Sequence, residues 1–286
     1  MSSEFLRGLL DLPRDEAKRR GEAMVTAIGA GNYRSAAGVV VDFSSLLEAA
    51  TAGTVEFEPA DDVSLARPSN GVRSTTVTVE NTTSLAAARE LVNAGHATAV
   101  LNFASATTPG GGFLSGARAQ EEYLARSTGL FGTLRGRRMY DWHRGRQDPF
   151  YADFVTWSPD VPVLCGDDGK WLERPWTVSI VTSPAVHANG VRRYLASRVH
   201  EIEPRMRRRT KKVLAVAANE GATGLVLGAW GCGAFGNDGQ MVAEIFREEL
   251  QGEFAGAFER IVFAITDWSI DERYIGPFRA AWAQWR

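Results

Sequence analysis

Short apolar segments alternate along this chain with segments whose apolar residues recur at helical spacing, and this alternation limits the fold more than any other feature. Apolar or alternating runs typical of buried and half-buried strands lie at 55–57, 72–80, 97–103, 176–183, 225–229 and 260–266. Helical spacing is found at 11–30, after Ser84 as an N-cap, and at 119–131, 191–199, 205–220, 239–250 and 277–285. Strands that alternate with helices pack as layers, so we expect one α/β domain with an N-terminal helical extension.

Size, composition and cysteine content exclude several classes of protein. The chain has 286 residues, 44% of them hydrophobic and 23% charged, which suffices for a large core and excludes intrinsic disorder. The net charge of −2 does not predict a polyanion partner at the level of the whole protein. Cys165 and Cys232 are too few for a disulfide framework, and neither has a Cys or His neighbour at metal-ligand spacing, so we expect no metal. The polar N-terminus and the absence of a long apolar run predict a soluble, cytoplasmic protein.

Two glycine-rich loops each come directly after an apolar strand. The first glycine loop runs from Asn102 to the triplet Gly110–Gly112, and the second runs from Gly228 to Asp238. Open α/β sheets bind ligands at the carboxyl ends of their strands, and glycine lets the backbone approach a phosphate closely. A single loop of this kind is explained better by tight turns, whereas two of them favour a diphosphate-sized site.

The first glycine loop leads into Gln120-Glu121-Glu122 at the first turn of a predicted helix. Acidic residues are common there because they complement the helix dipole, and this alone would explain either glutamate. A carboxylate beside a phosphate-binding loop does little for binding an anion, but it can act as a general acid in cleavage of a glycosidic bond. Spacing alone leaves both interpretations open.

These motifs carry a resemblance to a known family. The triplet Gly110–Gly112, followed after seven residues by Gln120-Glu121-Glu122, resembles the signature of the poly(ADP-ribose) glycohydrolases (the PARG family). The segment Gly231–Asn237 is similar to the second phosphate loop of the macrodomain fold that these enzymes share, and the compact chain resembles the bacterial-type members. The resemblance implies a macrodomain-like mixed central sheet flanked by helices. It also implies an N-terminal helical accessory segment at 1–70 packed as one unit with a catalytic domain at 71–286.

The resemblance implies a role for each matching residue. Glu122 would protonate the departing ribose 2′-oxygen and then activate water, while Glu121 would hold the ribose hydroxyls. Asn102 would reach a ribose hydroxyl, and Phe235 would pack against the terminal ribose, around which the glycine triplet folds. The other expected substrate-binding residues are Gln120 and the members of the second loop that would wrap the diphosphate, namely Gly231, Cys232, Gly233, Ala234, Gly236 and Asn237. No metal or organic cofactor is implied.

The implied activity is hydrolysis of the ribose–ribose O-glycosidic bonds of poly(ADP-ribose) with release of ADP-ribose. The implied partners are poly(ADP-ribose), ADP-ribose and ADP-ribosylated proteins as substrates, with no membrane and no sequence-specific nucleic acid, in the setting of the DNA damage response. Two other functions stay open. A non-catalytic reader of ADP-ribose would need no acid at Glu121 or Glu122, and the glycine loops alone would permit a hydrolase of mono-ADP-ribose linkages.

Several further residues have a structural interpretation beside a functional one. Phe235 is explained equally well as a plug of the core, and Asp267 as an ordinary turn acid or a pocket residue. The basic run 205–212 predicts the solvated face of a helix, and 135–146 predicts an exposed loop. The histidines are scattered, and Ser183 and Cys232 have no recognisable base, so serine or thiol catalysis is not expected. The N-terminal extension and 135–146 flank the predicted pocket, which favours cleavage from chain ends.

Overall fold

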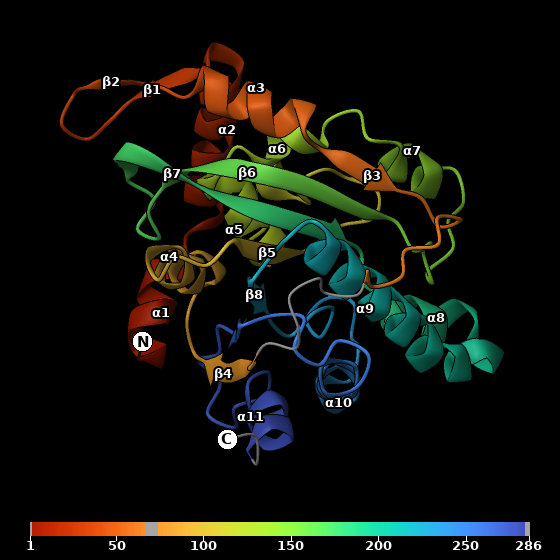
Figure 1. Ribbon diagram of the computed structural model, residues 1–286. Helices are drawn as coiled ribbons and strands as arrows, with labels where there is room; N and C mark the ends of the chain where they lie inside the picture. The colour runs from red at the N-terminus through yellow and green to blue at the C-terminus, as the bar shows by residue number, and fades with distance from the viewer. Residues whose placement is uncertain (1, 67–73, 284–286) are drawn as a thin grey trace.

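The computed structural model describes residues 2–66 and 74–283. Its centre is a seven-stranded sheet in the order β3-β6-β7-β5-β8-β9-β4 (Figure 1). The strands are β3 (Val55–Phe57), β4 (Thr76–Glu80), β5 (Thr98–Phe103), β6 (Val155–Cys165), β7 (Trp171–Ser183), β8 (Gly224–Leu227) and β9 (Arg260–Ala264). Each predicted strand overlaps an observed one, although the predicted start at residue 72 lies outside the described residues. The mixed sheet flanked by helices confirms the expected α/β fold.

The arrangement of the strands places the two glycine loops together. Strands β7, β5, β8, β9 and β4 are parallel, whereas β6 and β3 run antiparallel to their neighbours. Strands β5 and β8 are hydrogen-bonded to each other and point the same way. Because parallel strands end at one edge of a sheet, the loops that follow β5 and β8 meet there.

Strand β6 is the longest element that the sequence pattern did not predict. Pro159 and Pro162 lie within it, and proline is rare in a central strand because it cannot donate to the ladder. The pairing with β7 shifts register between Ser158 and Val161, and Asp160 between them has φ of 46°. This irregularity lets the strand continue past its prolines.

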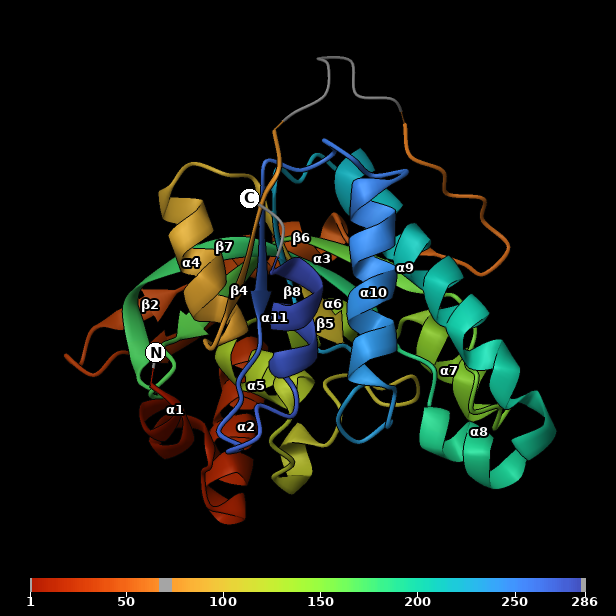
Figure 2. The ribbon, with the colours of Figure 1, turned by 90° about the horizontal axis from the view of Figure 1, so that it is seen from below.

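Helices cover both faces of the sheet. One face packs against α4 (Ser84–Asn93), α5 (Gln120–Ser127), α6 (Leu130–Leu134) and α7 (Arg138–Arg144). The other packs against α9 (Ile202–Asn219), α10 (Gly239–Gln251) and α11 (Gly276–Trp282), and Figure 2 shows α9 and α10 side by side. Helix α8 (Ala188–Tyr194) precedes a 3₁₀ turn at Ala196–Glu201. None of the described helices is long and apolar enough to cross a membrane.

The N-terminal extension packs against strand β6 and against helices α5 and α6. It comprises α1 (Ser3–Leu10), α2 (Arg14–Ala30), a hairpin of β1 (Asn32–Arg34) and β2 (Val40–Asp42), and α3 (Ser44–Ala52). Tyr33 is buried among its apolar residues and stacks on Trp171 of β7 with ring centroids 4.6 Å apart. Strand β3 follows α3 and pairs with β6 as an edge strand of the central sheet. The predicted boundary at residue 70 lies outside the described residues.

The helix boundaries differ from prediction in ways that have local causes. Helix α2 begins at Arg14, because Pro13 has an extended backbone with ψ of 141°. The N-cap of α4 is Thr83, not Ser84, since the Thr83 hydroxyl accepts from the Ala86 N–H at 3.0 Å. The predicted helix 119–131 is two helices, because Thr128 between them bridges to Val163 of β6.

Other helices also start or stop elsewhere than predicted. The predicted helix 191–199 begins earlier, as α8, and ends in the 3₁₀ turn. Helix α9 begins at Ile202, before the expected 205. The predicted end of the last helix at residue 285 lies outside the described residues.

Two expectations about surface segments were wrong. The segment 135–146 is not an exposed loop, since it contains α7, whose Tyr140 is only 1% exposed and belongs to the same buried cluster as Leu124 of α5. The basic run 205–212 is not solvated throughout, because Arg209 is 0% exposed and Lys212 is also buried. Burial of Arg209 follows from a partner distant in sequence, the carboxylate of Asp153.

Candidate active site

A cavity of about 610 Å³ opens at the carboxyl edge of the sheet, between the two glycine loops. Helix α5 and the second glycine loop contribute to its wall, together with the segment 264–269 that follows β9. Its walls therefore come from the ends of three parallel strands, which is where ligands bind in open α/β sheets.

Gln120 fixes the start of α5 against the end of β5. Its Oε1 accepts from the Phe103 N–H at 2.9 Å, and its Nε2 donates to the Leu101 carbonyl at 2.8 Å and to the Ser84 hydroxyl at 3.2 Å. The side chain thus replaces a missing strand neighbour at the end of β5. This clamp sets the position of the two glutamates that follow it.

Glu121 is buried at the bottom of the first glycine loop and is only 3% exposed. Its Oε2 accepts from the Ser105 N–H at 2.6 Å, whereas its Oε1 has no hydrogen-bond partner among the described residues. Burial raises the pKa of the Glu121 carboxyl well above its usual range, and the nearby charge of Glu122 raises it further. The hydrogen bond from the Ser105 N–H lowers the pKa but does not offset the effect of burial. A carboxyl in this environment favours its protonated form.

Glu122 has the same one-sided arrangement. Its Oε1 accepts from the Gly112 N–H at 2.9 Å, and its Oε2 is buried without a partner among the described residues. Gly111, with φ of 59°, passes so close that a Cβ there would lie 2.4 Å from Glu122 Oε1 and 2.9 Å from Glu121 Oε2. Only glycine fits at position 111, because both the left-handed backbone and the two carboxylates exclude a side chain.

The second glycine loop is closed by Asn237. Its Nδ2 donates to the carbonyls of Val186 at 2.7 Å and of Gly231 at 3.2 Å, across the base of the loop. Gly231 has φ of 74°, and a Cβ there would lie 2.5 Å from the Cβ of Ala185. Gly233 at the tip differs, since a Cβ there would meet nothing within 4 Å. The loop is rigid at its base and open where it faces the cavity.

Phe235 lies on the cavity wall at the end of this loop. Its ring centroid is 4.9 Å from that of His187 and 5.9 Å from that of Tyr151. The ring is partly buried, so one face packs against the core while the residue also borders the cavity. Both predicted interpretations of Phe235 are compatible with this position.

Comparison with known proteins agrees with this geometry. Residues 21–165 match the family model described as "Microbial-type PARG, catalytic domain". The chain belongs to this family.

Solved PARG structures match almost the whole chain. The poly(ADP-ribose) glycohydrolase of Thermomonospora curvata is 41% identical, covering 94% of this chain and 98% of its own, with a TM-score of 0.84. A structure of the same enzyme with the inhibitor ADP-HPD is 39% identical and has a TM-score of 0.84, covering 93% of this chain and 99% of its own. The Deinococcus radiodurans enzyme in complex with ADP-ribose is 40% identical, covering 84% and 98%, with a TM-score of 0.79. Comparison with curated proteins gives no match. Because the matching family model and structures are poly(ADP-ribose) glycohydrolases, the chain is a glycosidase.

The predicted site residues fall into two groups. Those that line the cavity are Gln120, Glu121, Glu122, Gly231, Gly233, Ala234 and Phe235. Those that do not line it, but shape the loops around it, are Asn102, Gly110, Gly111, Gly112, Cys232, Gly236 and Asn237. Asn102 is fully buried and donates to the Thr182 hydroxyl at 3.3 Å. Burial raises the pKa of the Cys232 thiol to about 12, which opposes a nucleophilic role.

Part of the cavity wall was not predicted from the sequence. It includes Leu9 and Leu10 at the end of α1, Leu12 after it, Arg20 and Ala23 on α2, and Asp167 and Trp171 at the turn between β6 and β7. These residues carry no motif, and only the folded chain brings them to the site. Asp267 is both a turn acid and a wall residue, since its carboxylate accepts from the N–H groups of Ser269, Tyr274 and Ile275.

Proposed function

We propose that Glu122 is the general acid and base with which this protein cleaves ribose–ribose bonds of poly(ADP-ribose). The observation that supports this role is that only one of the two carboxylate oxygens of Glu122 has a hydrogen-bond partner among the described residues. One carboxylate oxygen is held by the Gly112 N–H, and the other is buried beside the cavity without a protein partner. A carboxyl group fixed through one oxygen keeps the second available to give a proton to a substrate and take one back.

Cleavage of the glycosidic bond passes through an oxocarbenium-like state, in which the departing ribose oxygen gains a proton. Glu122 donates that proton, and as a carboxylate it then removes one from the attacking water. Glu121 has the complementary role of accepting hydrogen bonds from the ribose hydroxyls through Oε1, the oxygen that Ser105 leaves free. In this proposal Glu122 transfers protons and Glu121 positions the substrate.

The second glycine loop supports binding of a diphosphate. Its base is pinned by Asn237, so it needs little ordering on binding, and its tip at Gly233 leaves space in the cavity. Backbone N–H groups of such a loop suit phosphate oxygens. We infer that it holds the diphosphate of the terminal ADP-ribose unit, with Phe235 packed against the adjoining ribose. The substrates include polymer attached to proteins.

The test is to incubate the protein with poly(ADP-ribose) and, separately, with mono-ADP-ribosylated protein. Free ADP-ribose released from the polymer is the expected result. Release from the mono-ADP-ribosylated protein alone would favour a mono-ADP-ribose hydrolase, and tight binding without release from either would favour a reader. The variant Glu122→Gln is the matched control, because it retains the hydrogen bond to Gly112.

A further inference from the structure

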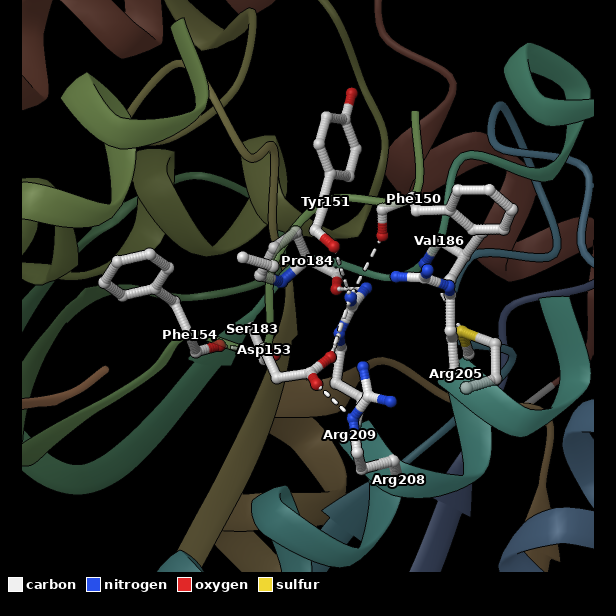
Figure 3. A network of polar contacts seen from close by, with 12 residues as sticks. Phe150, Tyr151, Asp153, Phe154, Ser183, Pro184, Val186, Arg205, Arg208 and Arg209 are labelled. Atoms are coloured by element: carbon white, nitrogen blue, oxygen red, sulfur yellow. Dashed lines mark hydrogen bonds and ion pairs between the residues drawn. The ribbon is translucent and has the colours of Figure 1, made fainter. Parts of the chain in front are cut away.

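Arg209, which the catalytic proposal does not use, lies at the centre of a buried network on α9 (Figure 3). Its Nε donates to Asp153 Oδ1 at 2.9 Å, and its Nη1 donates to the Pro184 carbonyl at 2.7 Å. Its Nη2 donates to the carbonyls of Phe150 at 3.0 Å and Tyr151 at 3.1 Å. A single guanidinium therefore joins α9 to two chain segments, one before β6 and the other after β7.

Stability alone is a weak explanation for this network. A buried ion pair often contributes no more than a well-packed apolar side chain of similar size, because both charges lose their hydration. The guanidinium differs from an apolar side chain, and from lysine, in presenting several N–H donors in one rigid plane. Its distinctive effect is to fix the relative positions of the groups it bonds.

The two segments bonded by Arg209 form the surface against which the second glycine loop packs. After Pro184 the chain continues to Ala185, which contacts the loop at Gly231, and to Val186, whose carbonyl accepts from Asn237 at 2.7 Å. On the other segment the Tyr151 ring lies 5.9 Å from the Phe235 ring. Arg209 thus does not touch the second glycine loop, but it bonds both of the segments that do.

Contacts around His187 join the same two segments to Phe235. The His187 N–H donates to the Pro149 carbonyl at 2.9 Å, and the Asn189 N–H donates to the Phe235 carbonyl at 2.9 Å. The His187 ring lies 4.9 Å from the Phe235 ring. A shift of either segment would therefore move the surface on which Phe235 rests.

Tyr151 also has a backbone conformation that requires support. Its φ of 53° is in the left-handed region, which a bulky residue other than glycine rarely adopts. Such a conformation persists only when surrounding contacts enforce it. The bond from Arg209 to the Tyr151 carbonyl is one such contact.

We propose that Arg209 is a positioning residue for the reaction, which holds Tyr151 and Pro184 so that Phe235 keeps a fixed orientation toward the cavity. This inference rests on the proposed function for its effect on turnover, but not for its effect on Phe235 itself. Arg208 is a matched control within the same network. It bonds the other oxygen of Asp153, but its side chain is 61% exposed and, among the described residues, makes no hydrogen bond to the backbone of either segment.

The experiment substitutes both arginines in the same way, as Arg209→Lys and Arg209→Met beside Arg208→Lys and Arg208→Met. Side-chain NMR spectra of protein labelled at phenylalanine report Phe235 without substrate, its signal being identified by its loss in Phe235→Ala. We expect the signal to shift or broaden in the Arg209 variants and to stay in place in the Arg208 variants. An unchanged Phe235 signal in a folded Arg209 variant would overturn the proposal.

Kinetics supply the second measurement. We expect Arg209→Lys to lower kcat at least tenfold while KM changes less than threefold, and the Arg208 variants to change neither. In the Phe235→Ala background the same substitution is expected to cost less than threefold, because the ring to be positioned is gone. A full tenfold loss in that background would show that Arg209 does not act through Phe235, and failure of both Arg209 variants to fold would show that its role is structural alone; either result would overturn the proposal. A displaced Phe235 signal with no turnover in any variant, parent included, would instead refute the proposed function.

Discussion

Replacing Glu122 by glutamine separates catalysis from binding and from folding. The amide retains a carbonyl oxygen that can accept from the Gly112 N–H, which is now bonded at 2.9 Å. Its NH₂ group replaces Oε2, the oxygen without a partner among the described residues. The change therefore keeps the contact that orders the first glycine loop and removes only the capacity to transfer a proton.

The size of the expected loss follows from these contacts. Because the loop contact is kept, the free energy of unfolding should change by no more than about 1 kcal/mol. A positioned general acid contributes about 10² to 10⁴-fold to a glycosidic cleavage, or about 3 to 5 kcal/mol of transition-state stabilisation. We expect turnover to fall at least ~10²-fold, while affinity for ADP-ribose stays within about threefold of the parent.

The assay combines release of ADP-ribose from poly(ADP-ribose) with calorimetry of ADP-ribose binding and a thermal unfolding curve. Asp15→Asn is the control, since Asp15 is an exposed acid in the first turn of α2 and does not line the cavity. If Glu122 served only to complement the helix dipole, both variants would lose about 0.3–1 kcal/mol of stability and keep their activity. A folded Glu122→Gln that cleaves the polymer within tenfold of the parent rate would refute the reasoning.

Four other outcomes are expected. Burial raises the pKa of Glu121 above its ordinary 4.5, so the stability that this carboxyl contributes is full below pH 4.5 and falls as the pH rises. The melting temperature of Glu121→Gln should therefore exceed that of the parent at pH 8 but not near pH 4.5, and the variant should also turn over more slowly. Burial lowers the pKa of His143 from 6.5 to about 4, so stability present above pH 6.5 should fall toward pH 4, and denaturant titrations of His143→Gln should lack this dependence. Gly233→Val should fold, because space surrounds the site of its Cβ, and should weaken ADP-ribose binding more than tenfold, or about 1.4 kcal/mol, by calorimetry. Cleavage should start at chain ends, since α1 borders the cavity, and early release of long free oligomers in a time course would contradict this.

The parts of the fold that could be predicted are those specified by neighbouring residues. Strand β5 is a short segment of mostly apolar residues, and both glycine loops and the Gln120-Glu121-Glu122 segment are recognisable from the sequence. Strand β6 could not be predicted, because its prolines argue against a strand unless the register shift with β7 is known.

Which charged residues are buried could not be predicted from the sequence either. In the sequence Arg209 is one of several cations on a helix, and its burial depends on Asp153 and on backbone carbonyls that lie far away in the chain. The same holds for the site. Its two acids stand in one motif, whereas wall residues such as Leu9 and Trp171 reach the cavity only through tertiary packing.

The pairing of β4 with β9 has a consequence for how this chain acquires activity as it is made. Thr76 pairs with Arg260 and Glu80 with Ala264, so edge strand β4 cannot pair until the much later residues of β9 have been synthesised. Contacts of such long sequence separation are slow to form, because the intervening loop must close first. The cavity also needs Leu9 from one end of the chain and Tyr274 from the other. A nascent chain therefore carries both glutamates long before it has a site around them, and enzymatic activity reports completion of the entire fold.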